Sequence, residues 1–230
     1  MEKKLRRNNG NSKDKLDGRI MDSKTIINNL ELMFKDAKCE LNYENDWQLL
    51  IAILLSAQCT DKKVNNVTPI LFSKYPSLKD LKEAQHSDVE KIIHSLGLSH
   101  NKAKNIIALS TILHDQYNDK VPNNKDELIK LPGIGVKTAN VMLIEYFNVP
   151  AFPVDTHVAR VSKRLNLCEE SDTVATIEKK LTNTFKEDTW ALLHLRMVLF
   201  GRYICKAIKP DCNNCLFNKK CTYKNNKQKK

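Results

Sequence analysis

Four cysteines stand close together near the C-terminal end of the 230-residue chain, with the spacing C-x6-C-x2-C-x5-C. The chain does not begin like a secretory signal, so we expect a reducing compartment, where clustered thiols are more typical of metal binding than of disulfides. The odd total of seven cysteines also disfavours a disulfide framework. The predicted metal ligands are Cys205, Cys212, Cys215 and Cys221.

Two metal groups accept four cysteines. Zinc ribbons usually pair two C-x2-4-C knuckles across a longer loop, whereas this stretch has one close pair, CNNC, with longer spacings on both sides. The longer spacings favour the larger [4Fe–4S] cluster. The run typical of ferredoxins, C-x2-C-x2-C-x3-C-P, is missing, which disfavours an electron carrier. The spacing by itself leaves zinc open as the alternative.

A second motif, LPGIGVKTANVML at 131–143, places two glycines directly before a predicted helix. Glycines permit a sharp turn and the close approach of another molecule, and the free N–H groups at a helix N-terminus bind anions. The spacing matches neither G-x4-G-K-[ST] nor G-x-G-x-x-G, which excludes the usual nucleotide loops. The alternatives are a purely structural turn between helices and a turn that binds a DNA phosphate through Gly133, Ile134, Gly135 and Val136.

Lys137 follows this turn, in the first turn of the predicted helix. A cation there opposes the helix dipole, which an exposed lysine tolerates at a cost of about 0.3 kcal/mol. Burial in a cleft would favour the neutral amine, which is the form that acts as a nucleophile. Asp155, in FPVDTHVARV, directly precedes another predicted helix, so its simplest role is an N-cap. A capping carboxylate is also held firmly enough to take part in chemistry, and both roles stay open.

Positive charge is concentrated at the C-terminal end. The formal net charge is +11, and residues 205–230 contain eight lysines against one acid, Asp211. Lys206 and Lys209 lie within the first loop of the cysteine motif, where a bound metal would fix them as a phosphate-binding surface. The longest apolar run, residues 49–55, is far shorter than the ~20 residues that span a bilayer, so we expect no membrane segment.

The elements that must position these residues are helices. A 3.6-residue apolar period recurs along the chain without strand-like alternation, which predicts an all-α protein with a seam after Phe147. We expect Asp46 to cap the most apolar helix, and Pro69 to kink the next helix or shift its start. The predicted helices are 25–37, 47–57, 61–74, 78–84, 88–95, 101–117, 125–130, 136–147, 156–165, 173–185 and 188–204.

The motif LPGIGVKTAN, the later VDTH and the cysteine spacing together resemble the endonuclease III family of the helix-hairpin-helix superfamily. LLSAQCTD at 54–61 and LGLSHNKAKNI at 96–106 are similar to other segments of that family, and the resemblance covers about residues 25 to 223. It implies a bifunctional DNA glycosylase and AP lyase in which Lys137 is the nucleophile and Asp155 the catalytic carboxylate. Gln58 and Leu98 would fill the gap left by a flipped nucleotide.

The resemblance also implies two helical lobes with a DNA-binding cleft between them. A six-helix barrel would occupy 39–149 and contain the helix-hairpin-helix at about 125–147, while 21–38 and 150–223 would form the lobe that holds a structural [4Fe–4S] cluster. Residues 1–20 are expected to be a disordered basic arm and residues 224–230 a basic tail.

The implied partner is double-stranded DNA that contains damaged pyrimidines or abasic sites, bound by a monomer at the nucleoid in a bacterial cytoplasm. A monofunctional adenine-mismatch glycosylase is one alternative, since that family shares the hairpin and cluster but lacks a lysine at the position of Lys137. A non-catalytic iron–sulfur DNA-binding protein is the other alternative, although pure binding gives no reason for Lys137 and Asp155 to occur together.

Overall fold

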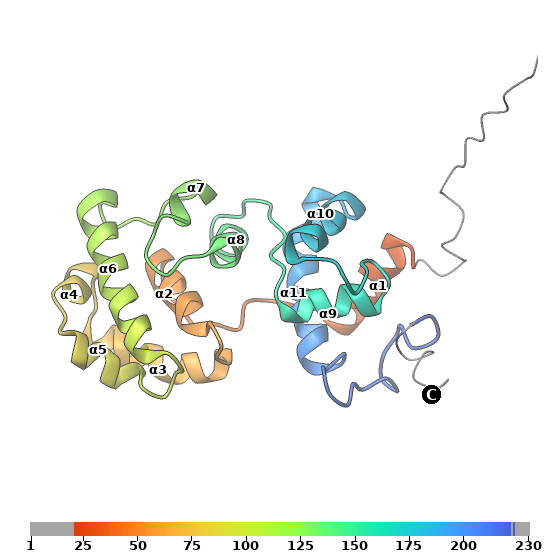
Figure 1. The fold of residues 1–230 in the computed structure, drawn as a ribbon, viewed down its shortest axis with the longest axis horizontal. Helices are drawn as coiled ribbons and strands as arrows, with labels where there is room; N and C mark the ends of the chain where they lie inside the picture. The colour runs from red at the N-terminus through yellow and green to blue at the C-terminus, as the bar shows by residue number, and fades with distance from the viewer. Residues whose placement is uncertain (1–20, 222, 224–230) are drawn as a thin grey trace, which may run out of the picture.

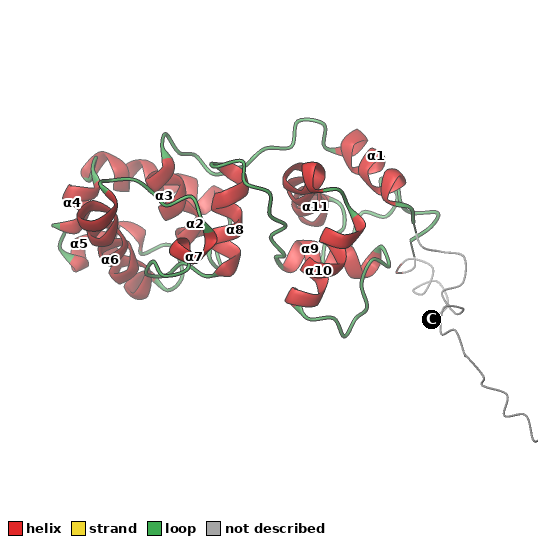
Figure 2. Ribbon diagram, turned by 90° about the horizontal axis from the view of Figure 1, so that it is seen from above, coloured by secondary structure: helices red, strands yellow, loops and turns green. Residues whose placement is uncertain are grey.

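The computed structural model describes residues 21–221 and 223, and this part of the chain is helical, with no strand (Figure 1). Figure 2 shows the same absence of strands from a second direction, so the all-α prediction is confirmed. The predicted arm at 1–20 and tail at 224–230 lie outside the described residues. None of the described helices is long and apolar enough to cross a bilayer.

Helix α2 (Asp46–Ser56) is the centre of the first lobe. Ten of its eleven residues are buried, as its apolar sequence requires, and it packs on α3, α6 and α8. The core of this lobe draws on residues 41–143. Its other helices are α3 (Asp61–Lys74), α4 (Leu78–Lys82), α5 (His86–Ile93), α6 (Ser99–Tyr117), α7 (Lys125–Leu128) and α8 (Val136–Glu145).

A separate core, built from residues 21–30 and 152–217, defines the second lobe. Helix α1 packs on α11, so the first and last helices of the described chain meet there. The chain therefore crosses between the lobes twice, after α1 and after α8 (Figure 1). The helices of this lobe are α1 (Ser23–Met33), α9 (Thr156–Arg164), α10 (Val174–Thr184), the 3-10 helix η1 (Glu187–Thr189) and α11 (Trp190–Tyr203).

One sequence-based expectation in the barrel lobe was wrong. Asn45, not Asp46, caps α2 through its side chain. Asp46 is instead the first helical residue, and its buried Oδ2 accepts a hydrogen bond from the Val121 N–H at 3.0 Å, which ties down the connector before α7. Helix α3 begins at Asp61 and continues through Pro69, so the proline does not shift the start of the helix.

Arg202 of α11 joins the two lobes. Its Nη1 lies 2.6 Å from Oδ2 of Asp61 in α3, and the same nitrogen donates to Glu40 in the connector before α2. The hydroxyl of Tyr203 also donates to Glu40, at 2.6 Å. Glu40, Asp61 and Arg202 are partly buried and share partners, so the network resists movement between the lobes better than an isolated surface ion pair would.

Candidate active site

A cavity lies between the lobes, and both predicted catalytic residues line it. Lys137 reaches it from the first turn of α8 in the barrel lobe, while Asp155 reaches it from the N-terminus of α9 in the second lobe. Ser56, Val198 and Arg202 contribute to the same wall. The fold thus brings a lysine and a carboxylate from different lobes to one space, each at the N-terminal end of a helix.

Asp155 is the N-cap of α9. Its Oδ1 accepts hydrogen bonds from the backbone N–H groups of His157 at 2.9 Å and Val158 at 2.8 Å. The capping role predicted from the sequence is therefore confirmed. Both of these bonds go to Oδ1, and the same side chain lines the cavity.

Lys137 is exposed in the free protein. Of the two settings considered for this lysine, the free protein has the exposed one, so removal of water from the amine requires a molecule that covers the cavity. Glu145, two helical turns further along α8, lines the same cavity. Burial raises the pKa of Glu145 to about 7, so its carboxyl is half neutral at that pH.

His194 of α11 fixes the segment that leads to Asp155. Its Nδ1 donates to the backbone oxygen of Pro153 at 2.8 Å, and the side chain is buried. Burial lowers the pKa of His194 to about 4, so the imidazole is neutral at physiological pH. No sequence pattern marks this role, because WALLHLRMVLF has the character of an ordinary apolar helix.

The two glycines of the turn before α8 have different roles. Gly133 has a φ of +76°, and a Cβ there would lie 2.8 Å from Nδ2 of Asn105. Gly135 has an extended φ of −94° and open space around it, so nothing within the protein requires a glycine at that position. Ile134, predicted to contact DNA, is 6% exposed, and its N–H donates to the backbone oxygen of Leu131, so in the free protein it anchors the turn.

Gly135 is the N-cap of α8, and no side chain caps this helix. The first-turn N–H groups are therefore open to an external acceptor. Val136, the first residue of the helix, is exposed beside them. The turn has the geometry of an anion site that a bulky residue at Gly135 would obstruct.

Gln58 and Leu98 are both exposed and both have left-handed backbones, with φ of 59° and 62°. Such conformations cost non-glycine residues about 1–3 kcal/mol and persist where the surroundings impose them, often at functional positions. Leu98 is 55% exposed, which excludes a core role for it.

One buried lysine supports both turns. Lys102 of α6 is 4% exposed, and its Nζ donates to the backbone oxygens of Leu55 at 2.9 Å and Ala57 at 2.8 Å, just before Gln58. Its own N–H donates to the oxygen of Leu98 at 3.0 Å. The sequence motif contained this lysine, yet its role was missed. The helical period of the buried residues of α6 does place Lys102 on the core side.

The four clustered cysteines line a single cavity beneath α11. Phe200 and Phe217 form part of its wall. Arg164 holds the first loop, because its Nη1 donates to the backbone oxygen of Lys206 at 2.7 Å and lies 3.3 Å from Sγ of Cys205. Burial raises the pKa of Cys215 to about 11, so several thiolates in this cavity need a cationic centre between them. The residues present therefore fit a thiolate-bound metal group.

Lys206 and Lys209 are exposed on the loop between the first two cysteines. Lys209 has a left-handed backbone with a φ of 51°, and Ile208, between the two lysines, is 81% exposed. Holding this loop at both ends would keep its two ammonium groups in place for a polyanion.

Comparisons with known proteins agree with this geometry. Residues 51–187 match the profile of the HhH-GPD superfamily base excision DNA repair protein, so the chain belongs to that superfamily. Endonuclease III of Bacillus subtilis (strain 168) is 48% identical over 183 residues, which are 80% of this chain and 84% of the relative. Endonuclease III of Rickettsia felis is 47% identical over 188 residues, 82% of this chain and 88% of the relative. Within the superfamily, the chain is a member of the endonuclease III family of base excision repair glycosylase/lyases.

Solved structures give the same assignment. A non-covalent endonuclease III–DNA complex has a TM-score of 0.87 and 46% identity, covering 90% of this chain and 97% of that chain. A trapped endonuclease III–DNA covalent intermediate gives 0.86 with the same identity and coverage. A thermostable thymine-DNA glycosylase, 21% identical with a TM-score of 0.77, shares the fold.

Proposed function

We propose that this chain removes oxidised or ring-fragmented pyrimidines from double-stranded DNA and then cuts the strand at the resulting abasic site. The observation that carries the proposal is the shared cavity of Lys137 and Asp155 between the lobes. The solved relatives, of which one is a DNA complex and one a trapped covalent DNA intermediate, support the same assignment.

In the proposed reaction, the damaged nucleotide rotates out of the duplex into the cavity, because its glycosidic bond is inaccessible in the stack. The neutral amine of Lys137 attacks C1′, the N-glycosidic bond breaks, and the base leaves with the electron pair and takes up a proton. The lysine nitrogen then loses a proton, the C1′–O4′ bond breaks, and O4′ takes up a proton as the sugar ring opens. The lysine is now joined to C1′ as a Schiff base, which makes the C2′ proton acidic. Loss of that proton breaks the C3′–O bond by β-elimination, and water releases the lysine.

Asp155 supports two parts of this sequence. Its carboxylate accepts a proton on the way to the neutral amine of Lys137, and it stabilises positive charge on the sugar as the base departs, as carboxylates do in glycoside hydrolysis. An adjacent carboxylate also stabilises an ammonium, which opposes activation. Lys137 is exposed in the free protein. DNA that covers the cavity therefore supplies the desolvation that favours the neutral amine over the ammonium.

Lys137 separates this proposal from its two alternatives. An adenine-mismatch glycosylase would release a base without a lysine in the cavity, and a binding protein would need neither the lysine nor the carboxylate. The test is borohydride treatment of the wild-type protein with a duplex that contains one thymine glycol or one abasic site. We expect a covalent adduct and a strand cut on the 3′ side of the lesion, and neither product with the undamaged duplex.

We further propose that the turn at Gly135 and the loop at Lys206 and Lys209 bind DNA phosphates on either side of the cavity. Gly135→Ser tests the turn. Serine is a favoured N-cap, so the free energy of unfolding should stay within about 1 kcal/mol of wild type. The new side chain would occupy the open space and bond the first-turn amides itself, so affinity for duplex DNA should fall about tenfold, or roughly 1.4 kcal/mol.

Gly133→Ala is the matched comparison for that variant. Its positive φ and the nearby Asn105 both oppose a Cβ, so the free energy of unfolding should fall by about 1–3 kcal/mol. Urea unfolding and the anisotropy of a labelled duplex measure the two effects. Unchanged DNA affinity in Gly135→Ser would count against the phosphate site.

Gln58 and Leu98 are proposed to fill the space of the flipped nucleotide, and Lys102 to hold both of them in place. Lys102→Met keeps the length of the side chain but leaves the carbonyls of α2 without their ammonium partner. We expect the free energy of unfolding to fall by about 2–3 kcal/mol. We also expect kcat/KM on damaged duplex to fall by more than the loss of folded protein explains, because both turns lose their support. Lys104→Met, two residues further along α6 and exposed, should change neither.

We propose that the cysteine cavity holds a [4Fe–4S] cluster, which ties together the ends of the loop that carries Lys206 and Lys209. A single zinc ion with Zn–S bonds of about 2.3 Å would hold its sulfurs roughly 3.8 Å apart. Among the described residues, no three of the cysteine sulfurs lie within 4.8 Å of one another, which supports the larger group. Purified protein should absorb near 400 nm. A colourless protein with one zinc per chain would overturn this assignment.

We also propose that the protein acts as a monomer on nucleoid DNA in a bacterial cytoplasm. The two lobes of one chain supply both cavity residues, so the chemistry requires no second copy. Size-exclusion chromatography with light scattering checks the monomer.

A further inference from the structure

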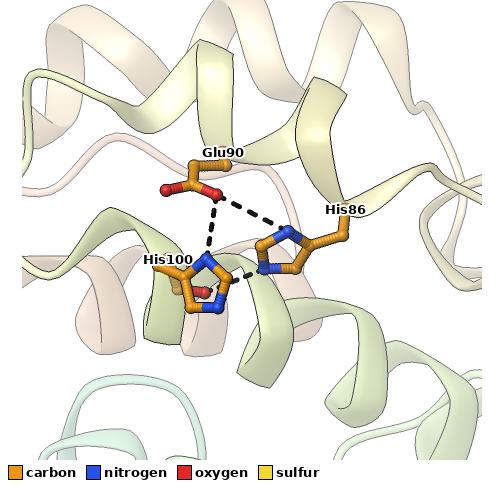
Figure 3. Close-up of side chains that lie close together, drawn as sticks. All are labelled: His86, Glu90 and His100. Carbon is orange, nitrogen blue, oxygen red and sulfur yellow. Dashed lines mark hydrogen bonds and ion pairs between the residues drawn. The ribbon is translucent and has the colours of Figure 1, made fainter.

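Three side chains that can ligate a metal converge on the barrel lobe, and the proposed repair chemistry uses none of them. His86 and Glu90 lie four residues apart on α5, so they share one face of the helix, and His100 comes from the first turn of α6 (Figure 3). Their ligand atoms all lie within 4.8 Å of one another. No other group of three such residues meets this condition in the part of the chain that the structure describes.

The distances suit a small ion. Nδ1 of His100 lies 3.1 Å from Oε2 of Glu90, and Nδ1 of His86 lies 3.5 Å from the same oxygen. A tetrahedral zinc site with bonds of about 2.0–2.1 Å places its ligand atoms roughly 3.3 Å apart. The two spacings lie on either side of that value, so shifts of a few tenths of an ångström would complete this side of the site.

The hydrogen bond of the His86 ring also suits a cation at this place. Its Nε2 is 3.0 Å from the backbone oxygen of His100, and since a carbonyl only accepts, Nε2 must donate. In the neutral imidazole the lone pair is then on Nδ1, which faces the carboxylate of Glu90. Two electron-rich atoms in this position are stabilised by a cation between them. A bond from the second ring nitrogen to a backbone carbonyl is also the usual outer contact of a metal-bound histidine.

We propose that His86, Glu90 and His100 bind one divalent transition-metal ion of the zinc class, through Nδ1, Oε2 and Nδ1, with water in the fourth position. Two imidazoles and a carboxylate are ligands that zinc accepts, and magnesium or calcium would require more oxygens. The His100 side chain is 72% exposed, which leaves the open side of the site accessible to the ion and to solvent.

Occupancy of this site would affect the turn that carries Leu98. The ligands on α5 precede residues 97–99 and His100 follows them, so the ion would join α5 to the start of α6 across the turn. We therefore expect the metal to restrict the backbone around Leu98. This consequence for repair rests on the proposed role of Leu98, whereas metal binding itself does not.

Calorimetric titration of Zn²⁺ into the untagged, full-length, cluster-loaded protein tests the proposal. We expect one equivalent to bind, and His100→Ala or Glu90→Gln to weaken that binding at least about tenfold. His94→Ala is the control, because His94 is an exposed histidine at the C-terminal end of the same helix and outside the group. Equal zinc affinity in wild type and His100→Ala, or no zinc binding by wild type, overturns the site.

Amide hydrogen exchange shows where the ion binds. Zinc should slow exchange across residues 94–101 in wild type and in His94→Ala, and have no effect there in His100→Ala. Slowing confined to residues 205–221 would place the ion at the cysteines and overturn the proposal. Strand cleavage is a separate measurement, so failure of the metal site and failure of the repair function are distinguishable.

Discussion

Lys137→Gln should form no borohydride-trapped adduct with thymine glycol duplex, and its strand cleavage should fall by at least about 10³-fold. The amine is the atom that joins C1′ in the proposed reaction, and an amide nitrogen cannot form the Schiff base that β-elimination requires. The side chain is exposed, and its charge opposes the α8 dipole, so the free energy of unfolding should stay within about 0.5 kcal/mol of wild type. Duplex affinity should change little, because the first-turn amides of α8 are unaltered.

Lys130→Gln supplies the control for this variant. Lys130 is also exposed and belongs to the hairpin region, but it is not among the residues that line the cavity. The substitution removes the same charge from the same helical hairpin, so a purely electrostatic role for Lys137 predicts similar losses in both variants. A chemical role predicts that Lys130→Gln still traps and cleaves. Trapping by Lys137→Gln would reject the lysine mechanism.

Local patterns predicted the helices well because the signals that set helices are local. The apolar period placed α3 at 61–74, which are the bounds that the structure gives, and the cap at Asp155 followed from residue type alone. The cap of α2 shows the limit of local patterns, because Asn45 caps this helix where Asp46 was expected to do so. Both residues are good caps, and the choice was made by a hydrogen bond from Val121, 75 positions away.

The site was predictable in part for the same reason. Lys137, Asp155 and the cysteines form motifs with characteristic spacing, so the sequence alone marks them. The roles of Lys102 and His194 depend on carbonyl groups in other segments, Ala57 and Pro153, which no sequence pattern places near them. The exposure of Lys137 is also a tertiary property, since it depends on how far the second lobe lies from α8. That exposure assigns desolvation of the amine to the DNA rather than to the protein.

Asp155→Asn should reduce glycosylase turnover by about 10²–10⁴-fold while leaving the free energy of unfolding within about 0.5 kcal/mol of wild type. Asparagine caps helices as well as aspartate does, so its side-chain oxygen can keep both bonds from the N-terminus of α9. What it loses is the charge that accepts a proton from Lys137 and stabilises the sugar cation. This one substitution therefore separates the capping role of Asp155 from its chemical role.

Asp155→Ala completes the comparison, because it removes the charge and the cap together. Its activity should match that of Asp155→Asn, and its free energy of unfolding should be lower by about 1 kcal/mol. Single-turnover base release and urea unfolding, measured on wild type and both variants, give the two values. On an abasic duplex, where no glycosidic bond remains, Asp155→Asn should lose less activity than on thymine glycol, since stabilisation of the departing-base transition state is no longer needed. Full base release by Asp155→Asn would leave the carboxylate a cap only, and the chemistry would then belong to Lys137 and the DNA.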